Sequence, residues 1–452
     1  TADSGDASTA TVTLESGATV VGTASDNGNA ESGITLVGTN QGGTFNATAN
    51  DGDITQSGLL QASNLNGTTL GLNATQTYND ADASTAILTT NKGDITYNDT
   101  DGVTITANTG SNSEGNVAIN TFAGTTSDNG VVDADLVFTG LNQGNTFTVN
   151  AASGDVLDDA TTVFTGSKLD LTANANVNLG NTGTLDFAQY KLTSAGVGNN
   201  FDIADTDNFE VLDVTASDTD VKLTASISGT ATDFNGNPLA PVVAEDNMLV
   251  DGVITVNNLT LLGKTGEIEL NNNITAGDTV TVSTIGTGGN INQAVGTTID
   301  AINTVDINTT GTNSAIDLAG STISDTSSVT VTTTNTNSGI TVESTATVDA
   351  ATDATLTTAN DDSDITVDGT INTTTGNILV STAGTNSDIT LNTTSVVNAG
   401  DTATVETTGA TSNITQFDGS TVTATNAVLV DTQADDSNIL IAGDLTSNNT
   451  TV

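Results

Sequence analysis

Carboxylates are the only side chains in this sequence numerous enough to support acid–base catalysis or metal binding. The chain has 54 acidic residues, no histidine and no cysteine. Its five basic residues are all lysines (Lys92, Lys168, Lys191, Lys222 and Lys264). Disulfides and zinc–thiolate sites are therefore excluded, and no imidazole or guanidinium group is available to assist catalysis.

Three groups of neighbouring aspartates have the composition of a glycosidase site: Asp205/Asp207, Asp218/Asp220 and Asp361/Asp362/Asp364. Glycoside hydrolysis needs two carboxylates about 5–9.5 Å apart. Sugar sites also use aromatic platforms, yet aromatic residues make up 3% of the chain and Trp is absent. Polysaccharide lyases need a basic residue beside the substrate, and here the lysines are scattered. Acidic pairs at turns are commonly solvated turn formers, so we expect that the protein is not an enzyme.

One segment resembles the start of a calcium-binding loop. The sequence NDTDG, residues 98–102, places Asp99 and Asp101 at the alternate positions that oxygen-ligand loops use. The later bidentate Glu of an EF-hand is missing, and the GGxGxD repeat of calcium-binding β-rolls does not occur. We therefore expect no obligate cofactor. Asp99 and Asp101 are calcium candidates, with diffuse cation binding as the alternative.

The net charge of −49 limits the partners of this chain. A polyanion such as nucleic acid would be repelled, and no basic cluster exists to bind it. No apolar run approaches the roughly 18 residues of a membrane helix, so membrane insertion is not expected. Such an acidic chain repels itself and needs salt or divalent cations for screening. Seawater or an extracellular matrix would supply them, and we predict an extracellular or cell-surface location.

A seven-fold isoleucine repeat dominates the C-terminal part of the sequence. Motifs such as TNSAIDL, TNSGITV and TNSDITL place an isoleucine every 24 or 25 residues, at Ile291, Ile316, Ile340, Ile365, Ile389, Ile414 and Ile439. A constant period of this size indicates a repeat architecture. Within each unit, apolar residues alternate with Thr in short runs that Gly, Asn and Asp separate, which is the pattern of half-buried strands.

These repeats predict an all-β fold, a right-handed parallel β-helix (β-solenoid) of about 20–25 residues per coil with three short strands per coil. No unit can bury its own apolar face, but stacked coils can. Each repeat isoleucine is expected to point inward, onto the isoleucine of the next coil. Asn and Ser before it should occupy the turn, where Asn tolerates the left-handed conformation.

The regularity of the repeat divides the chain into three parts. Residues 1–185 are predicted to form N-terminal solenoid coils, with a shorter repeat of about 20–21 residues per coil. Residues 186–250 lose the pattern and hold four of the ten Phe, both Pro and the one Met. We interpret them as irregular coils or an inserted subdomain. Residues 251–452 predict regular C-terminal coils.

Three stretches resemble the passenger repeats of filamentous-haemagglutinin-type exoproteins. They are GDITQSGLLQASNLNGTTLGLNA (52–74), KLDLTANANVNLGNTGTLDFA (168–188) and SNITQFDGSTVTATNAVLVDT (412–432). The resemblance implies a right-handed β-helix that is secreted across an outer membrane and serves as an adhesin or surface fibre. The secretion domain of that family is not seen at the N-terminus, and the extreme acidity is a departure from it.

Two functions remain open at this stage. One is a structural protein, a subunit or segment of a cell-surface fibre, sheath or biofilm matrix filament that stacks end to end. The other is the stalk of a large secreted adhesin, which binds a host cell or a surface glycan. The last residues resemble an ordinary coil and not a cap. Because an open coil edge can pair with another strand, self-association or continuation of a longer chain is expected.

Overall fold

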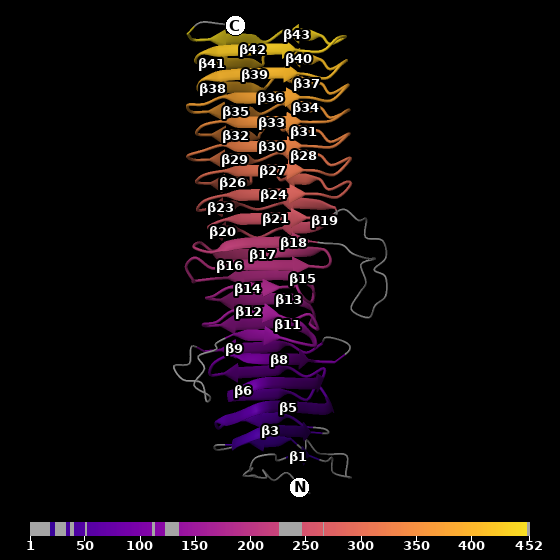
Figure 1. The fold of residues 1–452 in the computed structure, drawn as a ribbon, viewed down its shortest axis with the longest axis vertical. Coiled ribbons are helices and arrows are strands. Elements are labelled where there is room, and N and C mark those ends of the chain that lie inside the picture. The colour runs from indigo at the N-terminus through magenta and orange to yellow at the C-terminus, as the bar shows by residue number, and fades with distance from the viewer. Residues whose placement is uncertain are drawn as a thin grey trace. The chain divides into compact units, whose positions relative to one another are not determined.

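The computed structural model describes residues 19–22, 33–36, 40–49, 52–110, 114–122, 135–225, 246–264 and 266–449. In these residues the fold is all-β without a helix, a β-solenoid whose parallel strands are stacked in about 16 coils (Figure 1). The described strands divide into two compact units, one ending at Asp207 and the other beginning at Asn208. The parallel β-helix that the repeat predicts is confirmed. Its right-handed sense stays a prediction.

Unit 1 contains the first sixteen strands. They are β1 (Thr19–Gly22), β2 (Ile34–Leu36), β3 (Asn40–Ala49), β4 (Ile54–Gln56), β5 (Leu60–Leu72), β6 (Gln76–Asn91), β7 (Ile95–Asp99), β8 (Val103–Asn108), β9 (Val117–Thr121), β10 (Leu136–Phe138), β11 (Leu141–Ala151), β12 (Val156–Asp158), β13 (Val163–Ala173), β14 (Val177–Leu179), β15 (Thr184–Thr193) and β16 (Asn200–Asp205).

Unit 2 contains the remaining strands. They are β17 (Phe209–Ala216), β18 (Asp220–Ala225), β19 (Asp246–Val250), β20 (Ile254–Val256), β21 (Leu259–Gly263), β22 (Glu267–Leu270), β23 (Ile274–Ala276), β24 (Val280–Thr284), β25 (Ile291–Gln293), β26 (Thr298–Ala301), β27 (Val305–Thr309), β28 (Ile316–Leu318), β29 (Ser321–Ser324), β30 (Val329–Thr333), β31 (Ile340–Val342), β32 (Thr347–Ala350), β33 (Ala354–Thr358), β34 (Ile365–Val367), β35 (Thr370–Thr373), β36 (Ile378–Thr382), β37 (Ile389–Leu391), β38 (Val396–Ala399), β39 (Thr402–Thr407), β40 (Ile414–Gln416), β41 (Thr421–Ala424), β42 (Ala427–Thr432), β43 (Ile439–Ile441) and β44 (Asp444–Ser447).

Each regular coil of unit 2 contributes one strand to each of three parallel ladders. The first ladder runs β22–β25–β28–β31–β34–β37–β40–β43. The second includes β26–β29–β32–β35–β38–β41–β44. The third includes β24–β27–β30–β33–β36–β39–β42. Since each strand hydrogen-bonds only with the coils before and after it, the fold is held together by stacking.

The repeat isoleucines form one in-register column in the first ladder. Ile291 pairs with Ile316, and the pairing continues in order to Ile340, Ile365, Ile389, Ile414 and Ile439. The first six side chains are at most 1% exposed, whereas Ile439 is 43% exposed. Ile439 differs from the expectation because no described strand pairs with the other edge of β43.

Unit 1 departs from the expected three short strands per coil. β5 and β6 contain 13 and 16 residues, and the three-residue strand β4 pairs with β6. In β5 the alternation of buried and exposed side chains breaks at Ser63 and Asn64, where two successive residues are exposed. The chain therefore turns a corner inside a continuous hydrogen-bonded strand, and no separate turn divides it.

Aromatic side chains fill the interior of unit 1. Phe164 lies 4.4 Å from Phe138, 4.6 Å from Phe147 and 4.9 Å from Phe187 between ring centroids. Phe187 in turn contacts Tyr190 with centroids 6.0 Å apart. All five rings are fully buried. Edge-to-face and tilted contacts of this kind add to the stabilisation that burial alone provides.

The segment predicted to be irregular is largely strand where it is described. Residues 186–225 include most of β15 together with β16, β17 and β18, and β19 occupies 246–250. Two of the Phe residues that marked this segment, Phe187 and Phe201, are buried in unit 1. Residues 226–245, with both prolines, lie outside the described residues.

Candidate functional site

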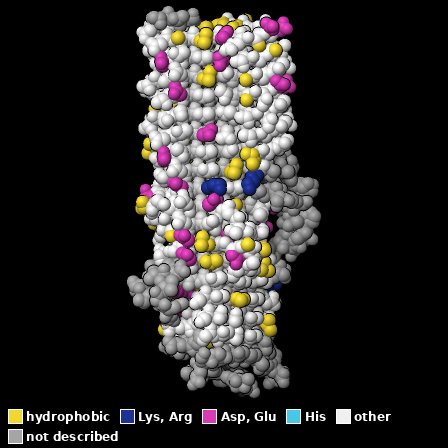
Figure 2. Space-filling view, viewed as in Figure 1, with side chains coloured by type: hydrophobic (Ala, Val, Ile, Leu, Met, Phe, Trp, Pro, Cys, Tyr) yellow, Lys and Arg dark blue, Asp and Glu magenta, His cyan; other side chains and the backbone are white. Residues whose placement is uncertain are grey.

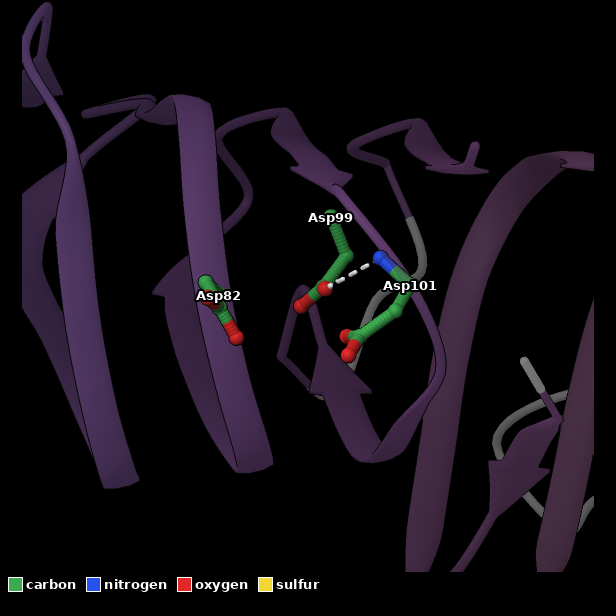
Figure 3. A group of neighbouring side chains, drawn as sticks. All are labelled: Asp82, Asp99 and Asp101. Carbon is green, nitrogen blue, oxygen red and sulfur yellow. Dashed lines mark hydrogen bonds between the residues drawn. The ribbon is translucent and has the colours of Figure 1, made fainter. Parts of the chain in front are cut away.

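Three aspartates from two neighbouring coils of unit 1 form the one acidic group in the described residues that is compact enough for a metal ion. Asp82 lies on β6, Asp99 ends β7, and Asp101 follows in the turn (Figure 3). One carboxylate oxygen from each lies within 4.8 Å of the others. The ladder explains this proximity, because Ala81 pairs with Asp99 and so places Asp82 beside it. Sequence analysis had selected Asp99 and Asp101, whereas Asp82 is added by the fold.

Asp99 is a buried carboxyl with three hydrogen-bond donors. The Tyr97 hydroxyl and the backbone N–H of Ala83, at 3.3 Å, both donate to its Oδ2. The N–H of Asp101 donates to its Oδ1 at 3.2 Å (Figure 3). Asp99 and Tyr97 are both fully buried. The side chain thus connects β7 to the adjacent strand and also closes its own turn.

Burial dominates the electrostatics of this group. Desolvation raises the pKa of Asp99 to about 8, although the hydrogen bond from Tyr97 opposes the shift. Desolvation also raises the pKa of Asp101, while its side-chain hydrogen bond with Asp99 lowers it. The two carboxyls therefore share a proton near neutral pH. A cation would have to displace that proton, and one oxygen from each carboxylate supplies three ligands, fewer than the six to eight oxygens that calcium usually takes.

The other predicted carboxylate groups connect neighbouring coils. Asp220 accepts the side-chain amides of Asn257 and Asn258, at 2.8 and 2.7 Å, and Asp218 is exposed in the preceding turn. In the cluster at 361–364, Asp361 accepts the N–H of Thr385, and Asp364 accepts that of Asp388, each at 2.7 Å. Asp362 has a positive φ of 54°. These contacts are those of turn residues. Asp205 is buried at the end of β16, and Asp207 lies in the turn that follows.

A column of left-handed residues occupies the turn before each repeat isoleucine. Three positions before the isoleucine, φ is positive at Gly288, Asn313, Asn337, Asp362, Asn386, Thr411 and Asp436. Gly, Asn and Asp adopt this conformation at low cost, but Thr is β-branched and does not. The turn role expected for Asn is found at Asn313, Asn337 and Asn386, and Gly, Asp or Thr occupies the same position in the other coils.

A buried serine ladder runs beside that column, two positions before the isoleucine. Ser363 shows the pattern: its hydroxyl accepts the N–H of Ser338 at 3.0 Å and donates to the Asn335 carbonyl at 3.1 Å. Thr358 donates to the carbonyl of Ser363 at 2.7 Å. Equivalent serine-to-serine bonds join Ser314, Ser338, Ser363, Ser387, Ser412 and Ser437. The Ser of six of the seven repeats thus bonds to a neighbouring coil, and from Ser314 to Ser412 it also bonds to its own turn, while Gly289 takes this position before Ile291.

The visible surface carries few cations. Lys92 forms an ion pair with Glu114 at 2.8 Å, and Lys168 and Lys191 both approach Asp170, at 3.3 and 3.9 Å. In Figure 2 the described part of the face is mostly uncharged polar and backbone atoms, with acidic side chains scattered over it. Where the chain is described, no helix is long and apolar enough to cross a membrane.

Comparison with known proteins found no match to a family model, to a curated protein or to a solved structure. The function must therefore be argued from the geometry of the chain itself.

Proposed function

We propose that this chain is a non-catalytic structural segment of an extracellular fibre, sheath or matrix filament, in which solenoid coils continue by end-to-end stacking. The observation that carries the proposal is the in-register pairing of each regular coil with the next, repeated from β25 to β43. β42, β43 and β44 pair with β39, β40 and β41, and no described strand pairs with their other edges.

The apolar side chains of β43, in the last described coil, show how much burial a stacked coil provides. Ile439 and Ile441 of β43 are 43% and 36% exposed, whereas Ile414 in the coil below is 1% exposed. A further coil in register would bury both, because each unit of the repeat is covered by its neighbour. Exposed strand edges with such side chains favour pairing with another strand.

Composition supports the non-catalytic and extracellular parts of the proposal. The chain has no His or Cys, and its carboxylate groups bridge coils or close turns. The charge of −49 requires screening by the surrounding medium. The resemblance of residues 52–74 and 412–432 to filamentous-haemagglutinin-type repeats favours a surface location. A stalk that presents an adhesive region elsewhere is the remaining alternative.

The experiment compares the wild-type chain with Ile439→Asp and with a matched control, Leu440→Asp. Ile439 belongs to the inward isoleucine column, whereas Leu440 follows Thr415 in the outward column of the same ladder. We expect concentration-dependent filaments by negative-stain electron microscopy and large species by sedimentation velocity. Ile439→Asp should abolish them, because a charge would be buried at the joint, and Leu440→Asp should retain them.

Two results would contradict stacking. One is a wild-type chain that stays as single particles at every concentration tested; the other is an equal effect of the two substitutions. Single particles that bind to cells or to glycan surfaces would favour the adhesin stalk instead.

A further inference from the structure

Asp205, the last residue of β16, is a carboxyl in the interior of unit 1. It is 1% exposed, and Tyr190 beside it is fully buried. The Tyr190 hydroxyl and the N–H of Phe187, at 2.9 Å, donate to its Oδ2. The N–H of Asp207 donates to its Oδ1 at 2.8 Å. The carboxyl therefore ties the end of β16 to β15 and closes the turn that follows.

The charged groups around Asp205 within this unit are mainly acidic. Asp186 of β15 and Asp207 of the turn both interact with this cluster electrostatically. β14, which pairs with β16, has no ionisable side chain in Val177–Leu179. On β16 itself Asp202 occupies an outward position. The lysines of the neighbouring strands, Lys168 and Lys191, lie against Asp170 on β13.

An ionised Asp205 would thus be a buried anion beside other carboxylates. Desolvation raises the pKa of Asp205 well above its usual range, and the negative charge of Asp186 adds to this. The hydrogen bonds from Tyr190 and from the N–H groups of Phe187 and Asp207 lower the pKa, but desolvation is the larger effect. A tyrosine hydroxyl can either donate or accept, so the bond between the two residues can persist when Asp205 carries the proton.

We propose that Asp205 is a neutral carboxylic acid in the folded chain, and that transfer of its proton to solvent in alkaline solution releases the tie between β15 and β16. The connection between β15 and β16 is then reversible and controlled by pH. The same arrangement recurs at Asp99, where Tyr97, the N–H of Ala83 and the N–H of Asp101 are the donors. Both sites share the sequence Asp-Thr-Asp, although the proposal rests on Asp205 alone.

The direction of the pH effect follows from proton linkage. In the unfolded chain Asp205 would lose its proton near the ordinary aspartate pKa of about 3.9, whereas the folded chain keeps it to much higher pH. Between these values folding takes up a proton, so stability is full below the lower value. It is lost as the pH rises through the raised pKa of the folded state.

Hydrogen exchange of the full-length chain, measured by mass spectrometry over residues 184–207, tests whether β15 and β16 separate when Asp205 loses its proton. After correction for intrinsic exchange, we expect opening in the wild type to become about tenfold more favourable for each pH unit between the two pKa values, and to level off above the raised pKa, which is the midpoint of the transition. Asp205→Asn is neutral at every pH and should stay protected throughout. Asp202→Asn, the matched control on the outward side of β16, should behave like the wild type.

The proposal is overturned if the wild type is equally protected from about pH 5 to about pH 10, or if a folded Asp205→Asn is open even in acid. Tyr190→Phe provides a test that does not depend on the folding of Asp205→Asn. It removes a donor that favours the ionised form, so the midpoint of opening should move to higher pH. A midpoint that is unchanged or lower in Tyr190→Phe also overturns the proposal.

Discussion

At the scale of single residues, the turn before each repeat isoleucine shows which side chains the backbone requires. Six of the seven left-handed positions carry Gly, Asn or Asp, and Thr411 is the exception, with φ of 58°. Its hydroxyl bonds to Asn386 in the turn below. This hydroxyl also bonds to the Ala410 carbonyl at 2.6 Å, so two hydrogen bonds accompany a conformation that strains a β-branched residue.

Thr411→Asn should stabilise the chain. Asn adopts the left-handed conformation more readily and keeps a side chain able to bond with the neighbouring turn, so we expect a gain of about 1 kcal/mol. Denaturant unfolding followed by circular dichroism measures it. Asn386→Thr, the reverse change one coil below, should destabilise by a similar amount; if both variants match the wild type, strain at this position is not significant.

Calcium should compete with a proton at Asp82, Asp99 and Asp101. The pKa of Asp99 is raised to about 8, so the stabilisation that its proton provides is lost as the pH rises through that value. We expect millimolar Ca²⁺ to raise the melting temperature more at about pH 9 than at about pH 6, because the carboxylates are then ionised.

The control for calcium binding is Asp99→Asn, which removes a ligand charge and the titration together. It should show the same small response to Ca²⁺ at both pH values. A calcium response in the wild type that does not depend on pH, or one that survives in Asp99→Asn, would argue for diffuse binding to the acidic surface.

At the scale of the element, the coils are joined by polar ladders as well as by strand pairing. Each buried serine satisfies groups in the coil before it and in its own turn. Buried polar groups of this kind are costly when a partner is removed, since the other groups remain without a hydrogen bond. The turn is consequently as much a part of the interior as the strands.

Ser363→Ala should therefore destabilise unit 2 by about 1–3 kcal/mol, because it leaves the N–H of Ser338 and the Asn335 carbonyl without this partner. Ser344→Ala, at an exposed turn position two residues after Val342, is the matched control and should have little effect. Urea unfolding of both variants provides the comparison. Equal midpoints for the two would mean that water replaces the lost hydroxyl.

At the scale of the whole molecule, charge opposes the compact state. A chain with a net charge of −49 and five basic residues repels itself. The strands are held by local stacking between coils, so the repulsion is spread along the chain. Small ions in the medium should therefore control stability more than any single ion pair does.

Raising NaCl from about 10 mM to about 150 mM shortens the screening length from about 30 Å to about 8 Å. We expect the melting temperature of the full-length chain to rise over this range. KCl should act identically, because screening does not depend on the identity of the cation. A melting temperature that falls with salt would show that self-repulsion is not the dominant electrostatic effect.

Sequence alone determined the features that repeat locally. The 24- and 25-residue spacing predicted the solenoid and the isoleucine column, because the period of the pattern is the length of one coil. The left-handed turns at Asn313, Asn337 and Asn386 followed from the chemistry of Asn. Asp99 and Asp101 could be selected because they are two residues apart in one loop.

Tertiary structure decided what depends on the register between coils. Asp82 joins Asp99 only because β6 and β7 are paired, and the serine hydroxyls reach partners 24 or more residues away. The long strand β5 bends at Ser63 and Asn64 without ending there, so these turn formers do not mark the end of a strand. Sequence spacing gives the length of a coil. The contacts between coils depend on the register in which each strand pairs with the strand of the preceding coil.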